Sequence, residues 1–273
     1  MIKEMDRSPI GVFDSGLGGL TVVRELKKLL PCEDIVYFGD TGRVPYGTRS
    51  RDTILRYAQQ DMRFLLSKNV KMIIAACGTV SSILGDGVDV SVPFTGVVKP
   101  AAAAAVKATK NGKIGITGTQ ATISSKSYVK EIGALAPDAQ LFEKACSLFV
   151  PVVENGFVGI DDPLPEIVVR RYLEPMMENG IDTLILGCTH FPILAPIISK
   201  VLGESVTLID AGAETARYAA SLLGENDMLC KDGKSGKYSY YVSDRTDDFS
   251  VVAGTFLGED ISGSVDRVDI HSL

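Results

Sequence analysis

The stretch LILGCTHFPIL, residues 184–194, determines how the rest of the sequence is interpreted. Apolar residues and a glycine lead directly into Cys188 and, two residues later, His190. A second stretch, MIIAACGTVSS at residues 72–82, repeats this design with an apolar run followed by Cys77 and small polar residues. Because short apolar runs of this kind indicate buried strands, each cysteine is predicted to follow a strand.

Outward from these two stretches, short apolar runs alternate with longer amphipathic ones. PIGVFD precedes LTVVRELKKLL, and DIVYFGD precedes RDTILRYAQQDMRFLLSK. Strands of four to eight residues that alternate with helices of ten or more indicate βαβ units and a parallel sheet. The pattern begins again near residue 97, and the tyrosine-rich stretch GKYSYYVSD near the end of the chain is expected to pack back on the first half.

We therefore expect an α/β protein of two domains, each a mainly parallel sheet flanked by helices. Residues 1–97 and 211–273 are predicted to form the first domain, and residues 98–210 the second. Gly11 precedes Cys77 at a spacing similar to that by which Gly115 precedes Cys188, which indicates a faint duplication. Ligands of parallel sheets bind beyond the carboxyl ends of the strands, so both cysteines should face one cleft from opposite sides.

Composition limits the classes of partner. The chain has 273 residues, a net charge of −6, 45% hydrophobic residues and no tryptophan, and it has no lysine- or arginine-rich block. A nucleic-acid or anionic-membrane surface would need an electropositive patch, so small molecules are the expected partners. The start MIKEMDRSPI lacks the apolar core of a secretory signal, and no run of 18 apolar residues occurs. A cytoplasmic protein is expected.

The five cysteines are odd in number, widely spaced and contain no C-x-x-C pair, so neither a disulfide framework nor a zinc ribbon is indicated. We expect free thiols and no metal. Cys32 and Cys230 lie in polar surroundings and suggest no site, and Cys146 is expected to fill space in the core.

Two loops could contact an anion. The segment DSGLGG, Asp14 to Gly19, follows a strand and opens a helix, where backbone N–H groups favour negative charge. It could equally be a tight turn with Asp14 as a helix cap. The segment GDTGRVPYGTRS, residues 39–50, could present a tyrosine and backbone amides to a carboxylate, or could simply be a turn.

Each cysteine taken alone could be a buried thiol that fills space. As a pair at strand ends, however, Cys77 and Cys188 suit an enzyme that removes a proton from one face of a carbon and supplies another from the opposite face. This reaction needs one thiolate, one thiol and no cofactor. His190 could be a core histidine or could assist proton transfer. A Cys–His–Asp hydrolase is the competing interpretation, and it leaves one cysteine without a role.

Six strings, found in this order along most of the chain, carry a family resemblance: IGVFDSGLGGLTVVREL, YFGDTGRVPYGTRS, GVVKPAAAAAV, IGITGTQATI, LFVPVVENG and LGCTHFPIL. Together they resemble the bacterial glutamate racemases of the cofactor-independent aspartate/glutamate racemase superfamily. The resemblance implies two pseudo-symmetric α/β domains with the active site between them. It also implies interconversion of L- and D-glutamate to supply D-glutamate for peptidoglycan, and a homodimer.

The resemblance also implies roles for individual residues. Cys77 and Cys188 correspond to the two acid/base residues, and Glu154 to an acidic residue near the site. The expected substrate contacts are Asp14, Ser15, Pro45, Tyr46, Gly47, Gly78, Thr79, Thr119, Thr189 and His190.

One departure concerns Gly78, because the family usually has asparagine between the first cysteine and the threonine. Loss of its amide is expected to remove a hydrogen bond to the substrate, at a cost of about 1–3 kcal/mol if unreplaced. Two other functions stay open, the first of them because of Gly78. One is a racemase of aspartate or another small amino acid, and the other is a non-catalytic amino-acid-binding protein of the same fold.

Overall fold

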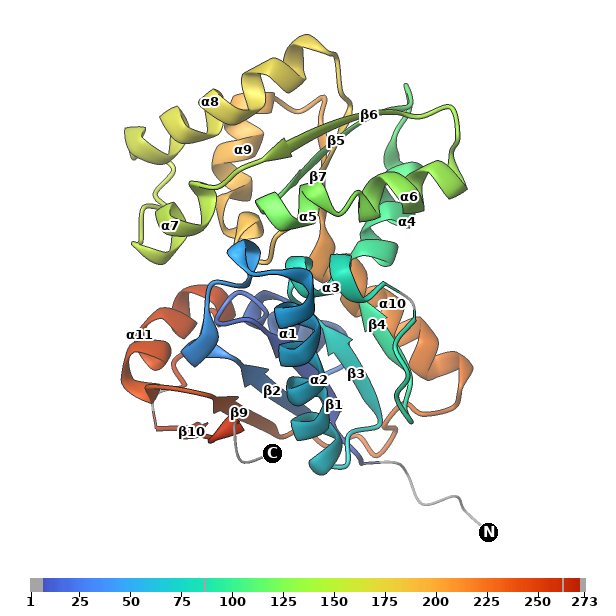
Figure 1. Ribbon diagram of the computed structural model, residues 1–273, viewed down its shortest axis with the longest axis vertical. Coiled ribbons are helices and arrows are strands. Elements are labelled where there is room, and N and C mark those ends of the chain that lie inside the picture. Colours follow the sequence, from blue (N-terminus) through green and yellow to red (C-terminus); the bar gives the residue numbers. More distant parts are fainter. Residues whose placement is uncertain (1–6, 86, 262, 271–273) are drawn as a thin grey trace.

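The computed structural model describes residues 7–85, 87–261 and 263–270, which form two parallel sheets with helices packed on their faces (Figure 1). Every strand pairing in these ranges is parallel. The predicted fold class is confirmed.

The first sheet has the strand order β10-β9-β2-β1-β3-β4. Its strands are β1 (Ile10–Asp14), β2 (Ile35–Gly39), β3 (Met72–Ala75), β4 (Phe94–Gly96), β9 (Tyr238–Val242) and β10 (Val265–Arg267). Its helices are α1 (Leu20–Leu29), α2 (Arg51–Ser67), α3 (Gly78–Leu84), α10 (Ala211–Glu225) and α11 (Thr246–Leu257), with the 3₁₀ turns η1 (Thr41–Arg43) and η2 (Tyr46–Thr48).

The second sheet has the strand order β6-β5-β7-β8. Its strands are β5 (Lys113–Gly118), β6 (Gln140–Ala145), β7 (Thr183–Leu186) and β8 (Thr207–Asp210). Its helices are α4 (Val98–Ala108), α5 (Gln120–Ser124), α6 (Ser127–Leu135), α7 (Phe149–Glu154), α8 (Pro163–Glu178) and α9 (Ala195–Leu202), with the 3₁₀ turn η3 (Phe191–Leu194).

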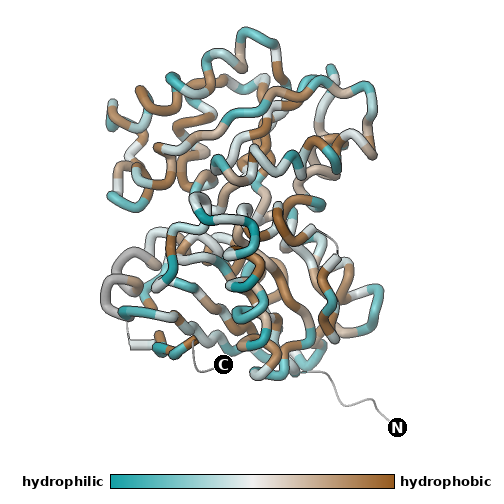
Figure 2. The backbone as a smooth tube through the Cα atoms, viewed as in Figure 1, coloured by the Kyte–Doolittle hydropathy of each residue, from teal (hydrophilic) through white to brown (hydrophobic). Residues whose placement is uncertain are grey.

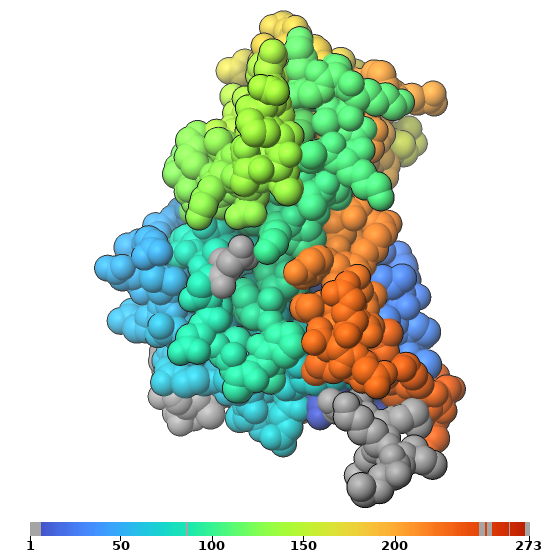
Figure 3. All heavy atoms as spheres, turned by 90° about the vertical axis from the view of Figure 1, so that its right-hand side faces the viewer, coloured from blue at the N-terminus to red at the C-terminus, as the bar shows by residue number. Residues whose placement is uncertain are grey.

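The chain passes between the two halves between β4 and α4 and again between β8 and α10. Figure 3 shows the two crossing regions, in green and orange, beside each other on one face of the molecule. From this distribution of strands we propose the division expected from sequence, with the described residues up to 97 and from 211 in one domain and 98–210 in the other.

Alternation of apolar side chains along the strands places a core on each face of the first sheet. Ile10 and Val12 of β1 belong to the core under α1 and α10, whereas Phe13 belongs to the core under α2. The core under α1 continues into the helices α7 to α9 of the second half. Figure 2 shows the same arrangement, with hydrophobic strands inside and hydrophilic helix faces outside.

Side-chain caps fix the beginning of several helices. Ser50 accepts a hydrogen bond from the Thr53 amide at the start of α2 (3.3 Å), and Asp162 accepts one from the Leu164 amide at the start of α8 (2.9 Å). Asp210 accepts hydrogen bonds from the first amides of α10. Among the described residues, no helix is both long and apolar enough to cross a membrane.

Candidate active site

A cavity of about 460 Å³ lies between the two halves, where the carboxyl ends of β1 and β3 face those of β5 and β7. This is the position that parallel sheets favour for ligands. All residues that the sequence analysis assigns to the site line the cavity: Asp14, Ser15, Pro45, Tyr46, Gly47, Cys77, Gly78, Thr79, Thr119, Glu154, Cys188, Thr189 and His190.

Cys77 lies on the wall contributed by the first half. It follows β3, precedes the first turn of α3 and is 6% exposed. Its Sγ donates a hydrogen bond to the Ser15 Oγ (3.4 Å). Burial and the nearby Asp14 carboxylate raise the pKa of the Cys77 thiol to about 12, because both disfavour a second negative charge. Cys77 is therefore a proton-bearing thiol in the free protein.

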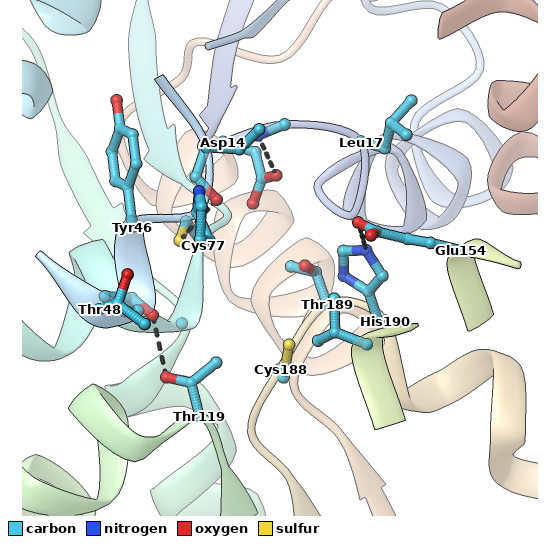
Figure 4. A pocket seen from close by; sticks show the side chains of 18 of the residues that line it. Asp14, Leu17, Tyr46, Thr48, Cys77, Thr119, Glu154, Cys188, Thr189 and His190 are labelled. Carbon is cyan, nitrogen blue, oxygen red and sulfur yellow. Dashed lines mark hydrogen bonds and ion pairs between the residues drawn. The ribbon is translucent and has the colours of Figure 1, made fainter. Parts of the chain in front are cut away.

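Asp14 ends β1 beside Cys77, as Figure 4 shows. One of its carboxylate oxygens accepts a hydrogen bond from the Gly16 amide (2.8 Å), and the other has no hydrogen-bond partner among the described residues. Burial raises the pKa of Asp14. Helix α1 begins after Gly19 without a side-chain cap, so the interpretation of Asp14 as a cap of this helix is wrong. Its unpaired oxygen faces a site where a ligand would bring donors.

Cys188 lies on the opposite wall, after β7, with His190 beside it (Figure 4). The His190 Nε2 lies 3.0 Å from the Glu154 Oε1. Burial lowers the pKa of His190, but its interactions with Cys188 and Glu154 outweigh burial and raise this pKa to about 10. The second wall therefore places a protonated imidazole directly beside the Cys188 sulfur.

Hydrogen bonds between threonines join the two halves beside the cavity. The Thr119 side chain caps α5 by accepting a hydrogen bond from the Thr122 amide (3.2 Å), and its hydroxyl lies 3.0 Å from that of Thr79. On the other side, the Thr21 hydroxyl donates to the Thr189 carbonyl (3.2 Å). The two halves therefore meet through hydrogen bonds on both sides of the thiols.

Tyr46 differs from the sequence expectation. Its hydroxyl donates to Asp40 and to Asp61 in a buried cluster that includes Arg43, instead of pointing into the cavity. Figure 4 shows the ring directed away from Cys188. Burial and the two carboxylates raise the pKa of Tyr46, so the phenol stays protonated. The turn can offer backbone groups to a ligand, whereas the tyrosine hydroxyl holds the turn in place.

Sequence reasoning missed part of the lining. Four of the nine missed residues, Gly16, Val44, Thr48 and Gln120, are direct chain neighbours of predicted ones, and for these four adjacency was the available signal. Cys146, expected to fill space, is 1% exposed yet lines the cavity, while Cys32 and Cys230 do not line it. The missed residues are Gly16, Leu17, Val44, Thr48, Gln120, Cys146, Ser147, Val150 and Pro151.

The lining suits proton transfer better than metal chemistry. No group of three or more histidine, cysteine, aspartate or glutamate side chains that could hold a metal occurs in the part of the chain that the structure describes. The cavity instead offers one thiol with a raised pKa and, on the facing wall, one cysteine beside an imidazolium. Such a pair can act as acid and base on opposite faces of a bound carbon acid.

Comparisons with known proteins agree with this geometry. The sequence profile of the Asp/Glu/hydantoin racemase family matches residues 14–219. Glutamate racemases from Geobacter metallireducens (41% identity, 96% of this chain and 97% of the relative) and Chlorobaculum tepidum (44%, 95% and 96%) are similar over nearly their whole length.

Solved structures show the same likeness. The glutamate racemase from Francisella tularensis, solved in complex with D-glutamate, superposes with a TM-score of 0.89 at 38% identity and covers 98% of this chain and 100% of its own. The glutamate racemase from Thermus thermophilus, solved in complex with beta-chloro-D-alanine, gives 0.88 at 42% identity over 99% and 100%. With its matching profile, fold and relatives, the chain belongs to the Asp/Glu/hydantoin racemase family.

Proposed function

We propose that this protein is a glutamate racemase that interconverts L- and D-glutamate without a cofactor and supplies D-glutamate for peptidoglycan. The observation that carries the proposal is the pair of cysteines on opposite walls of one cavity, with the acidic wall at Cys77 and the imidazolium at Cys188. The relatives named above support glutamate as the substrate.

In the direction from L- to D-glutamate, the Cys188 thiolate removes the α-proton, and the electron pair of the C–H bond stays on the carbon and is delocalised into the adjacent carboxylate. The Cys77 thiol then donates its proton to the opposite face. Cys188 ends as a thiol and Cys77 as a thiolate, and proton exchange with water restores the starting state. The reverse reaction uses the same residues in exchanged roles.

The remaining lining residues bind and orient the substrate in this proposal. Hydroxyl groups of Ser15, Thr79, Thr119 and Thr189 and the backbone of Pro45 to Gly47 provide polar contacts from both halves. Glu154, whose side chain is half exposed at the cavity, holds the protonated His190 through their hydrogen bond. Because the donors are placed for charged carboxylates, glutamine should be a poor substrate.

We further propose that the protein acts in the cytoplasm as a homodimer, without nucleic-acid or membrane partners. The family resemblance supports the dimer, and the composition supports a small-molecule partner. Light scattering with and without glutamate tests the assembly state, and a monomer under both conditions would contradict the dimer.

Racemisation assays test the proposed function. Purified protein is incubated with L-glutamate, L-aspartate or L-glutamine, without pyridoxal phosphate, and optical rotation is followed. We expect rotation to decay to zero for glutamate only. Decay for aspartate instead would show a racemase of different specificity, and binding of glutamate without loss of rotation would show a non-catalytic binding protein.

A further inference from the structure

Two glycines from opposite halves lie close together, and each is the direct chain neighbour of one cysteine that lines the cavity. Gly78 follows Cys77, and Gly187 precedes Cys188. A Cβ atom added at Gly78 would overlap the carbonyl oxygen of Gly187. The two halves therefore approach closely through backbone atoms that are next to both cysteines in the chain.

Gly187 cannot move away from this contact within its own half. Its amide donates to the Thr117 carbonyl of β5 (3.0 Å). A Cβ at Gly187 would itself overlap that carbonyl and would lie 3.0 Å from the ring of Tyr128, a side chain that is 1% exposed. The buried ring and the strand β5 thus support Gly187 from behind.

Gly78 is equally fixed in the first half. It is the first residue of α3, where the Ser81 amide donates to the Cys77 carbonyl (2.9 Å). The Ser81 side chain fills the space above Gly96 of β4, and its hydroxyl also accepts a hydrogen bond from the Val98 amide at the start of α4, where the second half begins (3.2 Å). A group added at Gly78 must therefore push the halves apart instead of repacking one of them.

We propose that the backbone contact between Gly78 and Gly187 sets the separation of Cys77 and Cys188, which makes Gly78 a positioning residue for proton transfer. This inference rests on the proposed racemase function. Gly78, where the family usually has asparagine, would then have a function of its own. The Gly187 carbonyl leaves no space for a Cβ atom at this position.

The expected effect follows from the distances that proton transfer needs. Reacting atoms must approach to about 3–3.5 Å, and a misplacement of about 1 Å can cost about 100-fold in rate. Because the substrate carbon lies between the sulfur atoms, a wider gap leaves at least one of them out of reach. Removal of the proton by one thiol can continue while delivery from the other is slowed.

The test is Gly78→Ala in the full-length protein, assayed with L- and D-glutamate. We expect kcat to fall by about 10- to 100-fold in both directions, with a smaller change in KM. In deuterated water, the variant should incorporate more deuterium into recovered substrate per molecule racemised than wild type does, because slower delivery from the opposite face leaves the thiol that formed the intermediate time to exchange its proton with the solvent before it reprotonates the same face. Gly78→Asn should be at least as impaired.

Gly115→Ala is the matched control. A Cβ there is also crowded, at 2.7 Å from Leu184 Cδ1 and 2.8 Å from Ile181 Cδ1, but these are ends of flexible side chains within one half. Its kcat should stay within about threefold of wild type, even if its melting temperature falls. Gly133→Ala, where a Cβ meets open space, controls for the substitution itself.

Three results would overturn the inference: a kcat of Gly78→Ala within about threefold of wild type, a kcat loss with an unchanged deuterium ratio, or a Gly78→Ala protein that fails to fold while Gly115→Ala folds. The last result would assign the contact to folding instead of spacing. Inactive wild-type protein would instead refute the proposed function, so the two failures are distinguishable.

Discussion

The two walls of the cavity share the same backbone arrangement but differ in the charged group that lies beside the cysteine. Each places a cysteine directly after a buried strand, Cys77 after β3 and Cys188 after β7. On the first wall the nearest charged group is the buried Asp14, which raises the pKa of Cys77 to about 12 together with burial. On the second wall it is His190, whose pKa is raised to about 10.

This difference shows how a duplicated architecture can yield unequal chemistry. The repeated strand end determines where a sulfur atom lies, whereas the neighbouring charge determines whether that sulfur carries a proton. A reaction that moves one proton from one face of a carbon to the other needs this inequality, because two thiols or two thiolates cannot start it. Substitutions that remove a cysteine or the charged group beside it should therefore lower the rate of racemisation.

The largest effect is expected from loss of either cysteine. Neither Cys77 nor Cys188 can replace the other, because each serves one face of the substrate. Cys77→Ala and Cys188→Ala should each abolish racemisation with the fold intact, and the double variant should be no worse, since residues that act as a unit are not additive. Optical rotation and circular dichroism provide the measurements, and Cys32→Ala, outside the cavity, should racemise normally.

Deuterium incorporation tests, in the wild-type protein, whether each cysteine exchanges a proton with only one face of the substrate. In deuterated water, product formed early from either enantiomer should carry deuterium, while recovered substrate stays largely unlabelled. Equal early labelling of both pools would indicate one base that serves both faces, contrary to the proposed mechanism.

A smaller loss is expected from His190→Gln, which removes the cation beside Cys188 and leaves a side chain of similar reach. We expect kcat/KM to fall by about 100-fold. The fall must be equal in both directions, because the enantiomers have equal free energy. The decline of wild-type activity as pH rises toward about 10, where His190 loses its proton, should be absent from the variant. An unchanged pH profile would contradict this role of the imidazolium.

Unfolding measurements at several pH values test the same histidine without substrate. The pKa of His190 is raised from about 6.5 in the unfolded chain to about 10 in the folded one. Its protonation therefore stabilises the folded state fully below pH 6.5, and this contribution is lost as pH rises toward 10. The wild-type advantage over His190→Gln in free energy of unfolding should shrink across that window, and a constant difference would refute the assigned shift.

Much of the architecture could be predicted because strand and helix periodicities are local signals. The runs that became β1, β2, β3, β5 and β7 are mainly apolar and are followed by small or polar residues, which placed Asp14, Cys77 and Cys188 at the carboxyl ends of the strands. The motifs shared with the family then identified more than half of the residues that line the cavity, even though no single motif would have been sufficient.

What could not be predicted depends on contacts between segments distant in sequence. Tyr46 lies in a turn, and nothing nearby in the chain shows that Asp61, from α2, would engage its hydroxyl. The absent side chain at Gly78 suggested a lost hydrogen bond, because the approach of Gly187 from the other half leaves no local trace. Cys146 looked like a core residue and is one, yet its position at the cavity follows from how the halves meet.

The smallest effect is expected from Ser15→Ala on the first wall. The Ser15 hydroxyl lies beside Cys77 Sγ and can donate to it once the thiol ionises, so it partly counteracts burial and Asp14 in setting the pKa of this thiol. Without the hydroxyl, that pKa should rise further, so Cys77 becomes a weaker acid toward the intermediate formed from L-glutamate. One such hydrogen bond contributes about 0.5–1.5 kcal/mol, or about 2- to 13-fold in kcat/KM.

Alkylation of Cys77 by iodoacetamide, measured in a Cys188→Ala background at pH 8 to 10, should slow by a similar factor, because only the thiolate reacts. Faster alkylation in Ser15→Ala would show that the serine shields the thiol instead of tuning it, and the contrast between the two walls would then rest on Asp14 and burial alone.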